Sequence, residues 1–523
     1  MRTALFGLAA VVGAAHGAAQ PPSAPAFRKP TLYEDLQMFS QVLNQIRVNH
    51  LDSADTHSLI LAAVEGMIQA ADPHSYVLPV ARLAPDRARA WEDGKLVPVP
   101  ITFQFVRGAP VVGSVAPLST AARQDILSGD ELIAADGQPI LGTSGEEISI
   151  GLAGPKNSAI RLTFARQRSD GSTLEVHRDV KRELVDEATA VPLAELLDPE
   201  TGYIRITTFS NARVADDLHE AVGRLKGRGM KRLVLDLRDN GGGIVSEAAR
   251  VAGEFLPAGA TVYISEEKKA AKPDTVTVKR SFWKQADRYP VVVLVNDGTA
   301  SASELVAGAL QDHDRALIVG RPTFGKSLLM RGFPLVDGSV IIMAFGRVKT
   351  PCGRVVQREY RSQSRHDYYR LAGAVRDTVG RPNCRTTGGR TVYGGGGVYP
   401  DAMLDPPALP PVWLARLDET DLPLAWVGGY LSGVTLPSLD SLLASRRPPG
   451  GAVASFRQFA AAKGATLPAD ADAEARLERM LLARIAYAKF GEAGYYRLAL
   501  AVDPVVRRAI GFFPQATELP GRP

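Results

Sequence analysis

The spacing of apolar residues predicts helices at the start of the chain. Between residues 30 and 78, apolar side chains recur every three or four positions in two runs, as on one face of an α-helix. The second run ends at Asp72-Pro73, where proline disfavours a helical conformation of the residue before it. We therefore expect a packed helical hairpin, and we assign residues 20–96 to a linker and an N-terminal helical region. The apolar positions are Leu36, Phe39, Val42, Leu43 and Ile46, then Leu59, Leu61, Val64, Met67 and Ile68.

From residue 97 to 185 the pattern changes to short runs rich in β-branched residues, separated by turns. The runs predict strands at 101–106, 110–115, 131–135, 159–166 and 173–180, and a short helix is a candidate at 120–126. Asp130, Gly137 and Gly142 punctuate these runs, as expected of turns. The segment therefore predicts a small β-rich domain.

The central segment, residues 190–405, alternates between buried strands and amphipathic helices. Apolar runs predict strands at 203–209, 232–237, 291–295 and 317–319, and helical spacing predicts helices at 211–228, 245–256 and 302–312. Residues 358–397 form a Gly- and Arg-rich insertion. A Pro-rich linker after residue 405 leads to a C-terminal helical extension, 406–523, with helices expected at 473–491 and 495–510. The fold class is therefore α/β.

The first residues of the chain indicate the compartment in which the protein acts. Residues 1–19 have a basic start, an apolar stretch from Ala4 to Ala15 and small residues around the end, the pattern of a cleaved secretory signal. A disordered N-terminus is the alternative. No later stretch reaches the roughly 18 apolar residues that a membrane helix needs. We therefore expect a periplasmic or secreted mature chain without a transmembrane segment.

Composition and cysteine usage narrow the function classes. The 523 residues carry 61 basic and 56 acidic side chains, a net charge of +5 without a basic run, which argues against a nucleic-acid partner. An oxidising compartment favours a disulfide between the two cysteines, Cys352 and Cys384, although two free thiols are the alternative. The cysteines and histidines lack zinc-site spacing. We expect no metal, and no organic cofactor is implied.

A phosphate-binding motif appears in residues 320–327, GRPTFGKS, but its context does not fit. A nucleotide loop of this kind needs a strand before it and a helix after it. The residues before it predict the strand. After Lys326, two short apolar runs flank Pro334 and the Asp337-Gly338 turn, which predicts a β-hairpin. We therefore expect no nucleotide partner.

Ser301 lies where a predicted strand, 291–295, turns into a predicted helix, 302–311. Free backbone N–H groups at a helix start can stabilise an oxyanion, and a serine nucleophile needs a base, for which a buried neutral lysine such as Lys326 is one solution. The plainer interpretation is that Ser301 or Ser303 caps the helix and that Lys326 lies on the surface. Ser265-Glu-Glu-Lys268 matches another Ser/Lys pattern, but its charged neighbours predict an exposed loop.

Together these motifs resemble the C-terminal processing peptidases, also called tail-specific proteases, over residues 31–405. The resemblance rests on the order of five pieces of sequence. They are Gly66-Met67 with Asp72–Ser75, Ser128–Ile133 with Asp136-Gly137, Asp236–Arg238 with Asn240 and Gly242-Gly243, Ala300–Asp312 with Thr323–Lys326, and Gly394–Gly397 with Pro400-Asp401.

The resemblance implies a fold, an activity and site residues. It implies a crotonase/Clp-protease-like α/β core, a PDZ domain at 97–185, Ser301 as nucleophile and Lys326 as general base. Gly242 and Ala302 would supply oxyanion N–H groups, whereas Asp236 and Arg238 would hold the loop. The activity would be that of a serine endopeptidase cleaving proteins or peptides, including near C-termini.

Two departures from the family qualify the resemblance. Met330 stands where the family usually has a glutamine that holds the lysine amine, and methionine accepts hydrogen bonds only weakly. Around residues 99–102 the usual carboxylate-binding glycines of the PDZ domain are missing. The alternative function is therefore a catalytically impaired scaffold that binds a peptide through its PDZ domain.

Overall fold

The computed structural model describes residues 29–519 with internal gaps. These gaps are 54, 79–89, 91–94, 107–108, 116–118, 120, 122–123, 125, 141–144, 168–171, 184–188, 280–286, 336–339, 362, 375–376, 405–409 and 420–421. The predicted signal peptide lies outside the described residues. The chain forms two compact units, one up to Met67 and one from Ile68 onward. Within the described part, the helices are all too short or too polar to cross a membrane.

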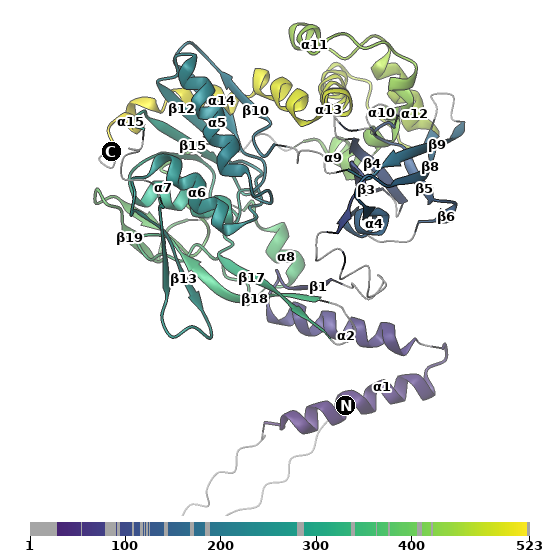
Figure 1. The fold of residues 1–523 in the computed structure, drawn as a ribbon, viewed down its shortest axis with the longest axis horizontal. Helices are drawn as coiled ribbons and strands as arrows, with labels where there is room; N and C mark the ends of the chain where they lie inside the picture. Colours follow the sequence, from purple (N-terminus) through teal and green to yellow (C-terminus); the bar gives the residue numbers. More distant parts are fainter. Residues whose placement is uncertain are drawn as a thin grey trace, which may run out of the picture. The chain divides into compact units, whose positions relative to one another are not determined.

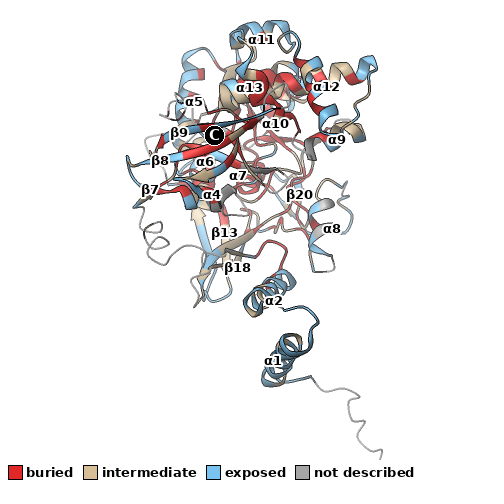
Figure 2. Cartoon of the chain, turned by 90° about the vertical axis from the view of Figure 1, so that its right-hand side faces the viewer, coloured by how far each residue is buried: buried red, intermediate tan, exposed pale blue. Residues whose placement is uncertain are grey.

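The first unit contains α1 (Leu32–Asn49) and most of α2 (Thr56–Ala71), which confirms both predicted helices. The second helix ends just before Asp72-Pro73, as expected. The predicted packing is wrong, however, because α1 buries none of its residues. Leu36, Phe39 and Val42 are 59%, 42% and 54% exposed, and Leu43 and Ile46 are only partly buried, so most of the apolar stripe of α1 is exposed (Figure 2).

Residues 96–181 form the predicted β-rich module. Its antiparallel sheet has the order β3-β4-β5-β8-β9, with the two-residue β6 (Gln138–Pro139) beside β5. The strands are β3 (Ile101–Val106), β4 (Ala109–Val115), β5 (Glu131–Ala135), β8 (Ala159–Gln167) and β9 (Thr173–Lys181), close to the predicted bounds. The sequence did not predict α4 (Gly145–Leu152), whose Ile148 and Leu152 join this core. The helix expected at 120–126 falls largely outside the described residues.

A six-stranded sheet of order β10-β11-β12-β15-β16-β21 forms the centre of the second unit (Figure 1). Only the β10–β11 pair is antiparallel. Alternate residues of β15 point to opposite faces, so Val293 joins α5, α6 and α7 on one face and Leu294 faces the other. The elements are β10 (Leu193–Leu196), β11 (Thr201–Arg205), α5 (Val214–Gly227), β12 (Arg232–Asp236), α6 (Val245–Phe255), β15 (Val291–Val295), α7 (Ala302–Asp312), β16 (Leu317–Gly320) and β21 (Ala402–Met403).

A second, antiparallel sheet carries the hairpin predicted after Lys326. Its strands are β1 (Tyr76–Leu78), β13 (Thr261–Glu267), β14 (Asp274–Thr277), β17 (Leu328–Pro334) and β18 (Val340–Lys349). The pairing of β17 with β18 confirms the hairpin, whereas its turn lies outside the described residues. The exposed loop expected at Ser265 is wrong, because Ser265 pairs with Val348 inside the sheet. Glu266 and Glu267 also lie on β13, and only Lys268 follows it in an exposed turn.

The C-terminal extension divides between two parts of the fold. Leu424 of α10 packs against Val111 of the β-rich module. By contrast, Val506 and Phe513 cover the second face of the six-stranded sheet, so the final helices belong to the core. The helices are α9 (Val412–Glu419), α10 (Leu422–Ser432), α11 (Leu439–Ser445), α12 (Ala452–Ala462), α13 (Ala471–Val502, interrupted at Gly491), α14 (Pro504–Ile510) and α15 (Phe513–Thr517).

Candidate active site

The candidate site forms where β12, β15 and β16 end at the same edge of the six-stranded sheet. Parallel strands direct their carboxyl ends to one edge, where α/β proteins commonly bind ligands. The loop after β12 carries Gly242, the loop after β15 carries Ser301, and the segment after β16 carries Lys326. Strand order therefore brings together three segments that are far apart in sequence.

Ser301 occupies a constrained turn at the start of α7. Its φ of 55° and ψ of −117° place it outside the regions that non-glycine residues prefer. Such a conformation costs about 1–3 kcal/mol and persists only when neighbours hold it. Here the Ala300 N–H and the Ser303 hydroxyl both donate to the backbone oxygen of Asn240, at 2.9 and 3.0 Å. Ser303 is fully buried and holds the turn, whereas Ser301 stays partly exposed.

Glu304 connects the Ser301 turn to the Lys326 segment. Its buried carboxylate accepts from the backbone N–H groups of Ser301, Gly325 and Lys326 at 2.8–2.9 Å. The Thr323 hydroxyl adds a fourth bond at 2.5 Å. Burial raises the pKa of Glu304 to about 6, although these hydrogen bonds favour the charged form. Within GRPTFGKS, the N–H groups of Gly325 and Lys326 are thus occupied by an internal carboxylate and are not free to hold a phosphate. Glu304 lies within the Ala300–Asp312 motif, but no local pattern in the sequence predicted this role.

Lys326 is partly buried beside the β17–β18 hairpin. Burial lowers the pKa of its amine, whereas the charges of Asp72 and Glu304 act in the opposite direction. Nearby His74 has a pKa lowered to about 4, first by burial and then by the positive charge of Lys326. Both shifts favour neutral nitrogen atoms, and a neutral amine can accept a proton.

Met330, the residue predicted at the lysine-orienting position, lies on β17 opposite Ala344 and is only partly buried. Other side chains surround the Lys326 segment instead. Gln357 accepts from the Ser327 N–H at 2.9 Å, and Tyr368 on α8 (Arg365–Arg370) contacts His74 and Gln357. The sequence carried no local signal for Gln357 or Tyr368, because they reach the site only through tertiary folding.

The two predicted oxyanion donors, Gly242 and Ala302, lie against each other. A Cβ on Gly242 would lie 2.8 Å from the Ala302 nitrogen and 2.6 Å from the Ala300 oxygen, and its φ is 91°. Only glycine fits this approach. The Gly242 N–H donates to the Asn240 side chain at 3.0 Å, so an oxyanion would have to share it. Within the described residues the Ala302 N–H has no protein acceptor, which leaves it available.

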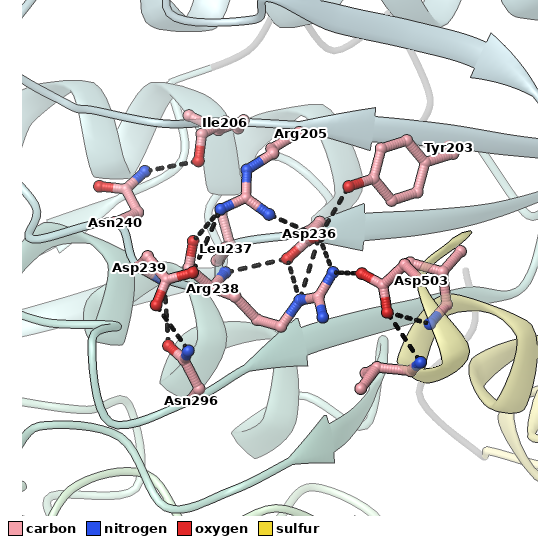
Figure 3. Close-up of polar contacts among 12 residues, drawn as sticks. Tyr203, Arg205, Ile206, Asp236, Leu237, Arg238, Asp239, Asn240, Asn296 and Asp503 are labelled. Atoms are coloured by element: carbon pink, nitrogen blue, oxygen red, sulfur yellow. Dashed lines mark hydrogen bonds and ion pairs between the residues drawn. The ribbon is translucent and has the colours of Figure 1, made fainter. Parts of the chain in front are cut away.

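A buried ionic network holds the loop that follows β12 (Figure 3). The fully buried carboxylate of Asp236 accepts from Tyr203 at 2.7 Å, Arg205 at 3.0 Å and Arg238 at 2.6 Å. Burial opposes its charge, but the neighbouring arginines and hydrogen bonds keep its pKa below the ordinary value. Arg238 also reaches Asp503 at the start of α14. These contacts give Asp236 and Arg238 the loop-holding role expected from the sequence.

A disulfide joins Cys352, after β18, to Cys384 on β19 (Asn383–Arg385), which pairs with β20 (Thr391–Tyr393). It ties the end of the hairpin strand to the insertion. Ligand atoms of Asp312, Cys352 and Cys384 lie within 4.8 Å of one another. Both sulfur atoms belong to the disulfide, however, so the cluster offers no thiolate for a metal ion.

Sequence comparisons show which known proteins this chain resembles. Residues 200–362 match the model described as Peptidase family S41. A carboxy-terminal-processing protease of Bartonella bacilliformis is 28% identical over 364 residues, covering 68% of this chain and 80% of that protein. Relatives from Synechocystis and Arabidopsis thaliana, also described as carboxyl-terminal-processing enzymes, are 35% and 36% identical, and the alignments span 56% and 46% of their lengths. The chain thus resembles peptidase family S41 over residues 200–362 and the carboxy-terminal processing proteases over a larger part of its length.

Among solved structures, a photosystem II D1 C-terminal processing protease is 24% identical and covers 74% of this chain and 90% of its own, with a TM-score of 0.35. That score is too low to support an argument from the overall arrangement. The resemblance inferred from the motifs is thus confirmed by sequence comparison.

Proposed function

We propose that this chain is a serine-type endopeptidase in which Ser301 is the nucleophile and Lys326 the general base. The observation that carries the proposal is the bridge through Glu304. One buried carboxylate binds the backbone N–H groups of both residues, at 2.9 and 2.8 Å, and so fixes their main chains around one point. The strained backbone of Ser301 and the lowered pKa of Lys326 agree with these roles.

The reaction would proceed through an acyl-enzyme. The neutral amine of Lys326 takes the Ser301 hydroxyl proton while the serine oxygen attacks the substrate carbonyl carbon. The resulting oxyanion accepts hydrogen bonds from the N–H groups of Ala302 and Gly242. The C–N bond then breaks, and the lysine ammonium returns the proton to the leaving amine. Water, deprotonated by the same lysine, attacks the ester and releases a carboxylic acid and the free serine.

The substrates in this proposal are proteins or peptides, including segments near C-termini. The β-rich module, with proposed bounds 97–185, would act as a PDZ domain that docks a peptide. Residues 190–405 would form the crotonase/Clp-like peptidase core.

We also propose a periplasmic or secreted location after removal of residues 1–19. N-terminal sequencing of the protein from its native host tests this location, and an intact Met1 would contradict it.

The decisive experiment is degradation of an unfolded protein such as β-casein by the parent chain and by Ser301→Ala and Lys326→Ala. We expect both variants to lose activity. Ser265→Ala and Lys268→Ala are the matched controls, because that second Ser/Lys pair lies on and just after β13 and should not matter. Activity retained in Ser301→Ala would contradict the proposal.

A non-catalytic scaffold is the second candidate function, and two observations favour it. Met330 stands where the family usually has a glutamine, and the Gly242 N–H already donates a hydrogen bond to the Asn240 side chain. A fluorophosphonate probe separates the candidates, because an active enzyme becomes labelled at Ser301 whereas a scaffold does not.

Titration with ATP tests the interpretation of GRPTFGKS as a nucleotide-binding loop. We expect no binding, because Glu304 occupies the N–H groups of Gly325 and Lys326.

A further inference from the structure

The insertion at 358–397 brings a tyrosine to the neighbourhood of Lys326. Tyr368 on α8 is fully buried. Arg358 fixes it by donating to its backbone oxygen at 2.6 Å and by placing its guanidinium 4.1 Å from the ring centroid. The ring also meets Phe324 and His74 edge to face, with centroids 5.7 and 5.2 Å apart. These contacts hold the Tyr368 side chain in one orientation and so fix the position of its hydroxyl.

The hydrogen bonds around His74 fix the direction of the Tyr368 hydroxyl. The Tyr369 hydroxyl donates to the Pro73 oxygen at 3.1 Å, so it can only accept from Nδ1–H of His74, also at 3.1 Å. In neutral His74 the other nitrogen, Nε2, must then be an acceptor. Nε2 lies 3.1 Å from the Tyr368 hydroxyl, which therefore donates to it in preference to the Gly325 oxygen at 3.4 Å.

The same hydroxyl accepts from Gln357, which contacts the Lys326 segment. Nε2 of Gln357 donates to Tyr368 at 3.1 Å, and its Oε1 accepts from the Ser327 N–H at 2.9 Å. Glu304 binds the preceding N–H groups of Gly325 and Lys326. The main chain around Lys326 is thus held from both sides. Within the described residues, by contrast, the lysine amine donates to no protein acceptor.

We propose that Tyr368 is a positioning residue for Lys326 and that, through Gln357 and His74, it replaces the glutamine that is missing at position 330. The chain Gln357–Tyr368–His74 would fix the start of β17, and with it the direction of the lysine side chain toward Ser301. This inference rests on the proposed function, because it assigns a role around the same base. Met330 can then be tolerated because the lysine is held through its main chain.

The test replaces the Tyr368 hydroxyl and keeps its ring. Tyr368→Phe leaves Gln357 and His74 without their shared partner, so we expect kcat to fall about 10- to 100-fold, the range for a slightly misplaced catalytic group, with KM within about twofold because uniform substrate binding is unchanged. Tyr360→Phe is the matched control, because its ring centroid lies 6.3 Å from that of Tyr368 while its hydroxyl makes no hydrogen bond within the described residues. Equal kcat values for the two variants would overturn the proposal.

A double-mutant cycle supplies a readout that a general loss of stability would not produce. Met330→Gln should restore part of the kcat of Tyr368→Phe and should have less effect in the parent chain. If it changes both backgrounds by the same factor, the two positions act independently and the proposal fails.

The pH profile gives a second readout. The groups facing Lys326 are Asp72, Glu304 and His74. Loosening this segment should let water reach the amine and move the acidic limb of kcat to higher pH. An unchanged limb would contradict the inference. Ser301→Ala and Lys326→Ala separate the two failures, because full activity in those variants would disprove the proposed function itself.

Discussion

Arg238 donates to the carboxylate of Asp503 across 265 positions of sequence, with 2.6 Å between nitrogen and oxygen (Figure 3). The same guanidinium nitrogen contacts the buried Asp236 at 2.6 Å. Asp503 also caps α14 by accepting from the N–H groups of Val505 and Val506. The ion pair between Arg238 and Asp503 therefore connects the final helices to the loop that carries Gly242.

Asp503→Asn tests this connection. Asparagine caps a helix about as well as aspartate, so the substitution chiefly removes the charge that faces Arg238. We expect the free energy of unfolding to fall by about 1–3 kcal/mol, the range for hydrogen bonds to charged groups, and peptidase activity to fall with it. Chemical denaturation measures the loss. Asp470→Asn, at the cap of α13, is the control and should lose less, because Asp470 has no ion pair with a buried arginine among the described residues.

Glu304→Gln should disrupt the bridge between Ser301 and Lys326. A glutamine offers one acceptor oxygen, and its amide N–H groups would face backbone N–H donors. Leaving buried N–H groups unsatisfied costs about 1–3 kcal/mol each, so we expect lower stability and a large fall in kcat. Glu359→Gln is an exposed control. Thermal melts and casein degradation, run side by side, measure both effects, and unchanged kcat in Glu304→Gln would contradict the bridging role.

The pH dependence of activity follows from the lowered pKa of Lys326. Under the proposed mechanism only the neutral amine of Lys326 can act as base, so activity should rise with pH, with an apparent pKa below the ordinary lysine value. The lowered pKa of Lys326 also affects stability. At pH values between the pKa of Lys326 in the folded chain and its ordinary value in the unfolded chain, the unfolded chain binds more protons, so the free energy of unfolding rises with pH. Lys326→Met should therefore be more stable than the parent chain at neutral pH. That advantage should disappear as the pH approaches the ordinary lysine pKa, and urea denaturation at several pH values measures it.

His74 predicts a second pH effect, in an acidic range. Its pKa falls from 6.5 to about 4 on folding. The unfolded chain therefore binds more protons between these values, and this contribution to stability is lost as the pH falls through that window. Glu304, with its raised pKa, acts in the opposite direction over part of it. The difference in stability between the parent chain and His74→Gln, measured at pH 7 and pH 4.5, isolates the histidine. A difference independent of pH would contradict the prediction.

The disulfide between Cys352 and Cys384 should stabilise the hairpin and the insertion together. It closes a loop with a sequence separation of 32 residues, so reduction should lower the free energy of unfolding by about 2–4 kcal/mol. Mass spectrometry with and without reductant first tests whether the bond forms. Adding reductant should destabilise the parent chain and leave a Cys352→Ser, Cys384→Ser double variant unchanged.

The sequence by itself determined most of the local structure near the site. Apolar runs located β12, β15 and β16, and helical spacing located α6 and α7. The Pro334 and Asp337-Gly338 signals predicted a hairpin, not a helix, after Lys326. These features depend on neighbouring residues, so local propensity suffices to predict them. The family motifs likewise pointed to Ser301, Lys326, Gly242 and Ala302, because each lies in a short stretch of recognisable sequence.

Tertiary structure alone decided what surrounds those residues. Glu304 became the bridge because the helix after β15 and the segment after β16 leave the same edge of one sheet. Tyr368 reached the Lys326 segment because an insertion folded back onto β1 and β17. Asp503 met Arg238 because the last helices cover the far face of the core. Such contacts join residues tens to hundreds of positions apart, and no local pattern encodes a partner at that distance. For the same reason, the apolar stripe of α1 predicted the helix correctly but predicted its packing wrongly.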